Sequence, residues 1–77
     1  MKYEIGDILT ISGVEYVVLD NILNEDKKYI FTNKIIENDE LGKEFYTFEV
    51  FEDGVKQIKD DKLLEILLPI FQNNING

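Results

Sequence analysis

The sequence predicts an α+β fold in which an antiparallel sheet of about five strands is followed by one C-terminal helix. Three observations predict it. β-branched and aromatic residues alternate with polar ones through most of the chain. Two short links ending in glycine, Ser12-Gly13 and Asp53-Gly54, indicate tight hairpins. Leucines near the C-terminus recur at the spacing of a helix.

The first hairpin joins residues 8–11 to residues 14–19. With Ser12 and Gly13 as its loop, one face pairs Ile11 with Val14, Leu9 with Tyr16, and Asp7 with Val18. We expect this to be the core face. The other face carries Ile8, Val17 and Leu19, so a helix, a curled sheet or another subunit must cover part of it.

The middle of the chain predicts two further strands separated by polar segments. Residues 21–27 are interpreted as a connection and residues 28–36 as the third strand. Residues 37–43 are rich in Asn, Asp, Glu and Gly and predict a loop. Residues 44–52 then form the fourth strand.

The last part of the chain predicts a second hairpin and a helix. Asp53-Gly54 suits a type I′ turn and leads into a fifth strand at residues 55–58. Asp60 or Asp61 can cap a helix over residues 61–71, whose apolar stripe is Leu63, Leu64, Leu67, Leu68 and Phe71. Pro69 should end or kink this helix near Leu68.

We therefore expect a single domain at residues 1–72 and a disordered tail at residues 73–77. Because both faces of the sheet have apolar positions, the alternative architecture is an SH3-like or partly open small barrel.

Composition excludes several classes of function. The chain has 16 acidic residues and 8 lysines, a net charge of −8, and no Arg, His, Cys or Trp. A net anion without arginine is unsuited to nucleic acid or to an anionic membrane surface. Disulfides and thiolate metal sites are excluded by the lack of cysteine. The charge favours a basic protein partner.

Catalytic chemistry is poorly supplied. Ser12 is the only serine, lies in a predicted turn, and has no His or Cys to activate it. Adjacent acids are expected by chance in so acidic a chain, and a small domain has little room for the cleft that two-carboxylate catalysis needs. A calcium loop starting at position 37 fails, since Leu41 and Phe48 would occupy ligand positions. We predict a non-enzymatic protein, with no catalytic, cofactor-binding or metal-ligating residues and no cofactor.

An ordered series of strand patterns supports a resemblance. It comprises Ile5-Gly6-Asp7, Gly13 to Asp20 (G-V-E-Y-V-V-L-D), Lys27 to Phe31 (K-K-Y-I-F), Phe48-Glu49-Val50, Glu52-Asp53-Gly54 and Leu63-Leu64. The chain resembles the short acidic uncharacterised proteins of low-GC Gram-positive bacteria and their mobile elements. That resemblance implies a cytoplasmic location and a small β-rich fold, and it transfers no activity. The N-terminus also lacks a signal-peptide pattern, and no stretch is long enough for a membrane span.

These features together predict a cytoplasmic protein-protein interaction or accessory module. Contact would use an uncovered strand edge or an aromatic face, with residues 37–43 and the outward side of residues 29–36 and 44–51 as candidates. Self-association into a homodimer is one form of this contact. The alternative is an acidic decoy that mimics nucleic acid on a basic protein, which requires carboxylates gathered on one face.

Overall fold

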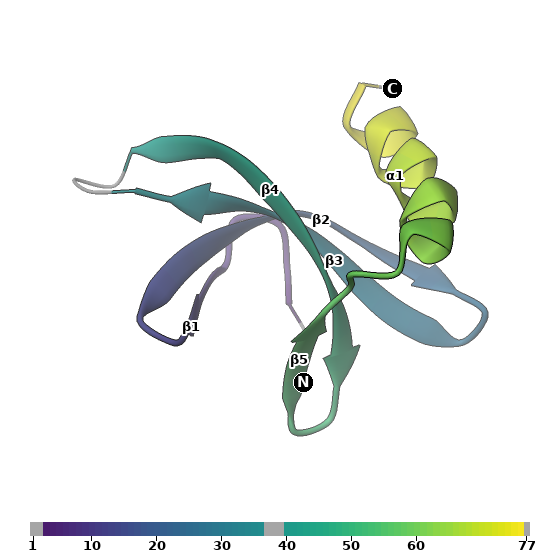
Figure 1. The fold of residues 1–77 in the computed structure, drawn as a ribbon, viewed down its shortest axis with the longest axis horizontal. Helices are drawn as coiled ribbons and strands as arrows, with labels where there is room; N and C mark the ends of the chain where they lie inside the picture. Colours follow the sequence, from purple (N-terminus) through teal and green to yellow (C-terminus); the bar gives the residue numbers. More distant parts are fainter. Residues whose placement is uncertain (1–2, 37–39, 77) are drawn as a thin grey trace.

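The computed structural model describes residues 3–36 and 40–76 as a curled five-stranded antiparallel sheet with one helix outside it (Figure 1). The strands follow chain order across the sheet, from β1 to β5. The elements are β1 (Ile8–Ile11), β2 (Val14–Asn24), β3 (Lys27–Ile35), β4 (Leu41–Phe51), β5 (Gly54–Gln57) and α1 (Asp61–Asn76). The predicted α+β class is confirmed, and the curl gives the sheet the shape of an open half-barrel, as in the alternative architecture.

The first hairpin has the predicted register. Ile11 pairs with Val14 and Leu9 pairs with Tyr16. Ser12 and Gly13 have φ of 51° and 80°, the left-handed conformation that a type I′ turn requires at both central positions.

β2 is longer than the sequence pattern predicts, because it continues through residues 21–24, where we expected a connection. The register of β2 against β3 shifts between Val18 and Asp20. This bulge reverses which side chains face inward, so Asp20 and Ile22 lie on the outer face, where Asp20 bonds to Asn74 of α1 and Ile22 packs against the cluster under the helix. The connection shrinks to Glu25 and Asp26, which have φ of 51° and 64°.

β4 begins at Leu41, inside the segment predicted as a loop, and residues 37–39 of that segment lie outside the described residues. A second register shift falls between Asn33 and Ile35 of β3, opposite the start of β4. The β4–β5 turn is also one residue earlier than predicted. Phe51 pairs with Gly54, so the turn residues are Glu52 and Asp53, and Gly54 belongs to β5.

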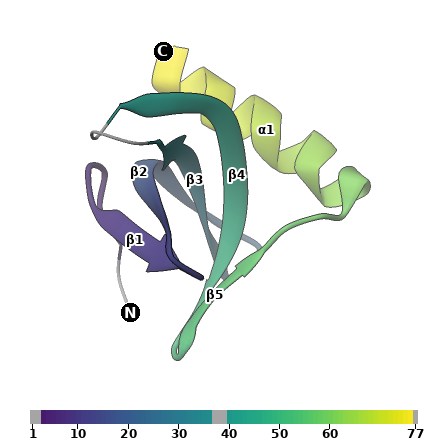
Figure 2. The ribbon, with the colours of Figure 1, turned by 60° about the vertical axis from the view of Figure 1, so that its left-hand side comes forward.

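The curl brings all five strands around one inner apolar cluster (Figure 2). Leu9, Val18, Ile30 and Phe48 are buried at its centre. Val55 of β5 packs against the same cluster as Leu9 of β1, although these two strands occupy opposite edges of the sheet. The right-handed twist of the strands lets the sheet curl, and the curl buries one apolar face.

α1 lies on the outside of the curl and buries a second cluster (Figure 2). Leu67 and Phe71 of α1 are 0 % exposed and meet Tyr29 of β3. The Asp60 carboxylate accepts a hydrogen bond from the Lys62 backbone N–H at 3.0 Å, which confirms the predicted N-terminal cap.

The predicted end of the helix is wrong, because α1 continues through Pro69 to Asn76 and includes residues that we placed in a disordered tail. Pro69 removes one intrahelical hydrogen bond, at a cost of about 3 kcal/mol. The helix beyond it is held to the sheet by the buried Phe71 ring. The Asn74 side-chain amide also donates to the Asp20 carboxylate of β2 at 3.0 Å.

Candidate functional site

A groove between β4 and α1, here called the β4–α1 groove, lies on the outer surface and has an uncharged lining. Its volume is about 430 Å³, and it is lined by Phe31, Phe45, Tyr46, Thr47, Gln57, Ile58, Leu64 and Leu68. Strands β3 and β4 form the floor of the groove, and α1 forms its wall. Gln57 and Ile58, where the chain leaves β5, close one end. None of these lining residues carries a formal charge.

Phe45 is the most exposed aromatic residue in this groove. Its ring stacks on that of Phe31 with centroids 5.6 Å apart and planes inclined by 3°. Phe31 also stacks on the fully buried Phe71, at 5.2 Å. Yet Phe45 is 54 % exposed. The three rings thus lead from the core under α1 to the surface, and the core holds the exposed ring in one orientation.

The helix wall presents a second exposed apolar group. Leu68 is 42 % exposed and lines the groove beside Leu64. Residues at i, i+4 and i+7 share one stripe of a helix, so Asp61 and Glu65 lie along the same stripe as Leu68. The outer rim of the groove on α1 is therefore acidic.

Strand β4, which forms part of the groove floor, has an open backbone edge. β5 pairs with β4 only from Phe48 onward, and the Ile58 N–H donates to the Thr47 carbonyl at 2.8 Å as the chain leaves the sheet. Backbone groups alternate sides along an antiparallel strand, so Phe45, two residues before Thr47, also directs its N–H and C=O away from β3. Within the described residues, no strand pairs with that side of β4 before Thr47.

Asn33 holds the opposite side of β4. Its side chain is 4 % exposed, and its amide donates to the carbonyls of Gly42 and Glu44 at 2.9 Å and 3.0 Å. These bonds replace ladder bonds that the second register shift removes. They also confirm that the even-numbered carbonyls of this segment face β3, which leaves the odd-numbered groups for the open edge.

A small polar cluster lies on the inner face of the same segment. The Tyr46 hydroxyl donates to the Glu44 carboxylate at 2.9 Å, and the Lys34 ammonium lies 3.5 Å from the same oxygen. The hydrogen bond from Tyr46, followed by the charge of Lys34, lowers the pKa of the Glu44 carboxyl below its ordinary value. The bond to Glu44 raises the pKa of the Tyr46 hydroxyl above its ordinary value.

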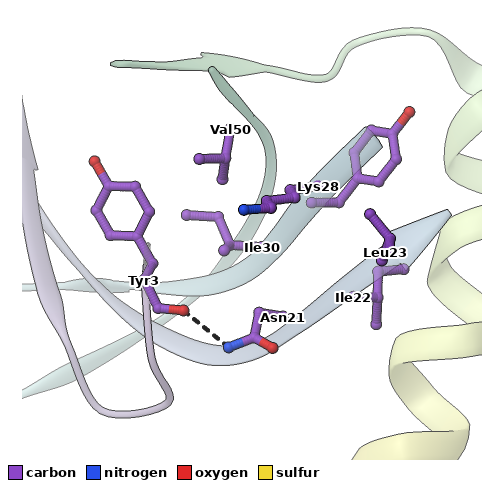
Figure 3. A pocket seen from close by; sticks show the side chains of 8 residues that line it. Tyr3, Asn21, Ile22, Leu23, Lys28, Ile30 and Val50 are labelled. Atoms are coloured by element: carbon purple, nitrogen blue, oxygen red, sulfur yellow. Dashed lines mark hydrogen bonds between the residues drawn. The ribbon is translucent and has the colours of Figure 1, made fainter. Parts of the chain in front are cut away.

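A second hollow, here called the concave pocket, lies inside the curl (Figure 3). Its lining comprises Tyr3, Asn21, Ile22, Leu23, Lys28, Tyr29, Ile30 and Val50, and its volume is about 200 Å³. The Asn21 amide donates to the Tyr3 carbonyl at 2.8 Å across its mouth. The volume is below the roughly 300 Å³ at which small-molecule sites begin, and Lys28 is the only charged residue in the lining. It is a weaker candidate than the β4–α1 groove.

The carboxylates lie at both ends of the sheet. Glu25, Asp26, Glu52 and Asp53 occupy the two turns at one end, whereas Glu15, Glu40 and Glu44 lie toward the other end. Lys27 and Lys28 line a shallow hollow together with Asp26 and Glu52. The acids are therefore interleaved with lysines.

No group of three or more His, Cys, Asp or Glu residues in the described part of the chain is arranged to hold a metal ion. Ser12 lies in the first turn, as expected, where it is exposed. Over residues 3–36 and 40–76, no helix has the length and hydropathy needed to cross a membrane.

The predicted contact regions are only partly brought together. On the outward side of β3, Tyr29 is buried under α1, and Phe31 is half-buried. Phe45 of β4 remains exposed, beside the predicted loop segment whose residues 41–43 now belong to β4. The contribution of Leu64 and Leu68 was missed. The sequence signal for this contribution is the width of the leucine stripe on the helix, which exceeds the width that packs against the sheet.

Comparison with known proteins adds no relative. No family model matches the chain, and the searches of curated proteins and of solved structures give no match.

Proposed function

We propose that this protein is a non-enzymatic protein-binding module of the cytoplasm, and that it docks its partner in the β4–α1 groove. The observation that carries the proposal is Phe45, an aromatic ring 54 % exposed yet oriented by its stacking on Phe31. Pre-oriented aromatic side chains at the edge of an apolar groove are typical anchors of protein interfaces. Leu68 supplies a second apolar contact on the facing wall.

The excess of negative charge supports a basic partner. A net charge of −8 raises the association rate with a basic surface and repels nucleic acid and other acidic proteins. The alternative role, an acidic decoy that mimics nucleic acid, has less support. Such a decoy needs carboxylates on one face, whereas Glu25 and Glu44 mark opposite ends of the sheet and lysines lie among the acids.

The proposal is tested by capturing partners from the native cell with three forms of the protein: wild type, Phe45→Ser and Leu23→Ser. Leu23 is a matched control, because it is also exposed and apolar, at 68 %, but lines the concave pocket. We expect a partner that wild type and Leu23→Ser capture equally and that Phe45→Ser loses. Loss with Leu23→Ser alone would move the site to the concave pocket, and equal capture by all three forms would contradict docking in either place.

A further inference from the structure

We propose that the partner adds an extended strand to the open edge of β4, and that this strand alternates apolar side chains with Lys or Arg. This inference rests on the proposed docking function and names the chemistry of the partner. An extended segment pairs through its backbone with an uncovered strand edge, and its alternate side chains fill neighbouring pockets.

The open edge has the geometry that this mode needs. β5 already pairs with β4 from Phe48 to Phe51, and the bond from Ile58 to Thr47 continues that line before the chain turns away into α1. An added strand continues in the place that β5 vacates. Residues 41–46 of β4 lie beyond this pairing, and at about 3.3 Å per residue they provide an edge about 20 Å long.

The side chains beside this edge match an alternating segment. Phe45 lies on the outer face of β4, next to Leu64 and Leu68 across the groove. Every second side chain of the added strand would point into the β4–α1 groove, whose lining is uncharged. Those positions therefore take apolar residues.

The rim selects the sign of the remaining side chains. Asp61 and Glu65 lie along the helix stripe beside the groove, and Glu40 lies next to the start of β4, whereas Lys43 is the only lysine of β4. The Glu44 carboxylate is already paired with Lys34 on the inner face. The net charge of −8 and the acids beside the edge therefore favour Lys or Arg at the positions of the added strand that point away from the groove.

The same charges disfavour a second copy of this chain as the added strand. Each copy carries a net charge of −8, so electrostatic repulsion disfavours the pairing of two β4 edges. Charged residues on an edge strand also discourage its pairing with an identical edge. We therefore assign the edge to a basic partner segment.

The test uses a pool of capped heptapeptides in which Lys or Arg alternates with Val, Leu, Ile or Phe. One control pool has the same sequences with N-methyl groups on alternate backbone nitrogens, which keeps every side chain but prevents pairing along one edge. A second control pool replaces Lys and Arg with Glu. Binding to the ¹⁵N-labelled protein is followed from its amide NMR signals.

We expect the basic pool to shift the amide signals of Phe45, Thr47 and Leu68 most. N-methylation should weaken binding about tenfold, the value of one to two lost hydrogen bonds, and the acidic pool should give no shifts. The inference is overturned if millimolar basic peptide gives no shifts, if the N-methylated pool binds equally, or if the shifts fall on the concave pocket. Concentration-dependent protection of the same amides without peptide would assign the edge to a second copy instead.

The outcome separates this inference from the proposed function. Partner capture that depends on Phe45, together with equal binding of the N-methylated pool, would leave docking in the β4–α1 groove standing and remove strand addition. Failure of the Phe45→Ser capture experiment would remove both.

Discussion

The ring of Phe45 lies parallel to that of Phe31, with an inclination of 3° and centroids 5.6 Å apart, and yet more than half of Phe45 is open to solvent. Phe31 is in turn stacked on Phe71, which is 0 % exposed. The same series of rings therefore serves stability at one end and, in our proposal, binding at the other.

The two ends of the ring series should respond differently to truncation. Phe71→Ala removes a fully buried ring and should lower the free energy of unfolding by about 3–5 kcal/mol. Phe45→Ala loses mainly a stacking contact, so we expect a decrease of about 1 kcal/mol. Urea unfolding followed by circular dichroism measures both. Equal losses for the two variants would show that Phe45 is a core residue and would weaken its assignment to binding.

The Asn33 amide is expected to be essential for the start of β4. Asn33→Asp keeps the shape but places carboxylate oxygens against the carbonyls of Gly42 and Glu44, where two N–H donors now lie. We expect a loss of about 3 kcal/mol in the free energy of unfolding. Asn73→Asp, the same change at an exposed helix position, should cost about 0.5 kcal/mol and serves as the control. A loss no larger than in the control would contradict this role of Asn33.

The Glu44–Tyr46 hydrogen bond should make stability depend on pH at both extremes. The pKa of Glu44 is lowered in the folded state, so its contribution is present above the unfolded-state value and is lost as pH falls through the folded-state value. The pKa of Tyr46 is raised, so its contribution is present below the ordinary value and is lost as pH rises through the raised one. The bond thus stabilises the fold across neutral pH.

Titration of the Glu44 carboxyl by ¹³C NMR measures this coupling directly. Tyr46→Phe should move the pKa of Glu44 back up toward its ordinary value. Lys34→Gln should also raise the pKa of Glu44, because it removes both the charge and the hydrogen bond of the lysine. An unchanged pKa of Glu44 in Tyr46→Phe would mean that Lys34, rather than the phenol, sets the charge of this cluster.

The Asn74–Asp20 hydrogen bond should order the end of α1. Asn74→Ala removes the donor that ties the last turns to β2, so backbone amides after Pro69 should exchange with solvent about tenfold faster. Asn73→Ala changes an exposed neighbour and should leave these rates almost unchanged. Unaltered exchange in Asn74→Ala would show that Phe71 alone holds this part of the helix.

Local signals explain which parts of the fold were predictable. The register of the first hairpin follows from a two-residue turn ending in Gly13 and from alternation on each side of it. The extended β2 was missed because a bulge near Leu19 changes which face the later residues occupy, and no residue type marks it. The start of β4 was missed because its order depends on Asn33, which is distant in sequence.

The candidate site was predictable only in its aromatic half. Phe45 and the outer side of its strand follow from alternation along β4. The groove itself depends on where β5 leaves the sheet and on the side of α1 that Leu68 occupies. Both are set by packing between elements, on which local sequence patterns carry no information.

The turn between β2 and β3 offers a route to a more stable protein. Glu25 and Asp26 both adopt left-handed backbone conformations, with φ of 51° and 64°, which cost a non-glycine residue roughly 1 kcal/mol each. Replacing the pair with Asn-Gly, the preferred type I′ sequence, should raise the free energy of unfolding by about 1–2 kcal/mol. Urea unfolding of the double variant Glu25→Asn, Asp26→Gly measures the gain.

The β4–β5 turn supplies the matched control for that change. Its residues Glu52 and Asp53 are also adjacent acids in a two-residue link, but neither has a positive φ. The double variant Glu52→Asn, Asp53→Gly removes the same charges and relieves no left-handed strain, so it should be neutral or lose up to about 1 kcal/mol. If both double variants gained equally, the gain would come from reduced repulsion among the acids, and the strain assigned to Glu25 and Asp26 would be wrong.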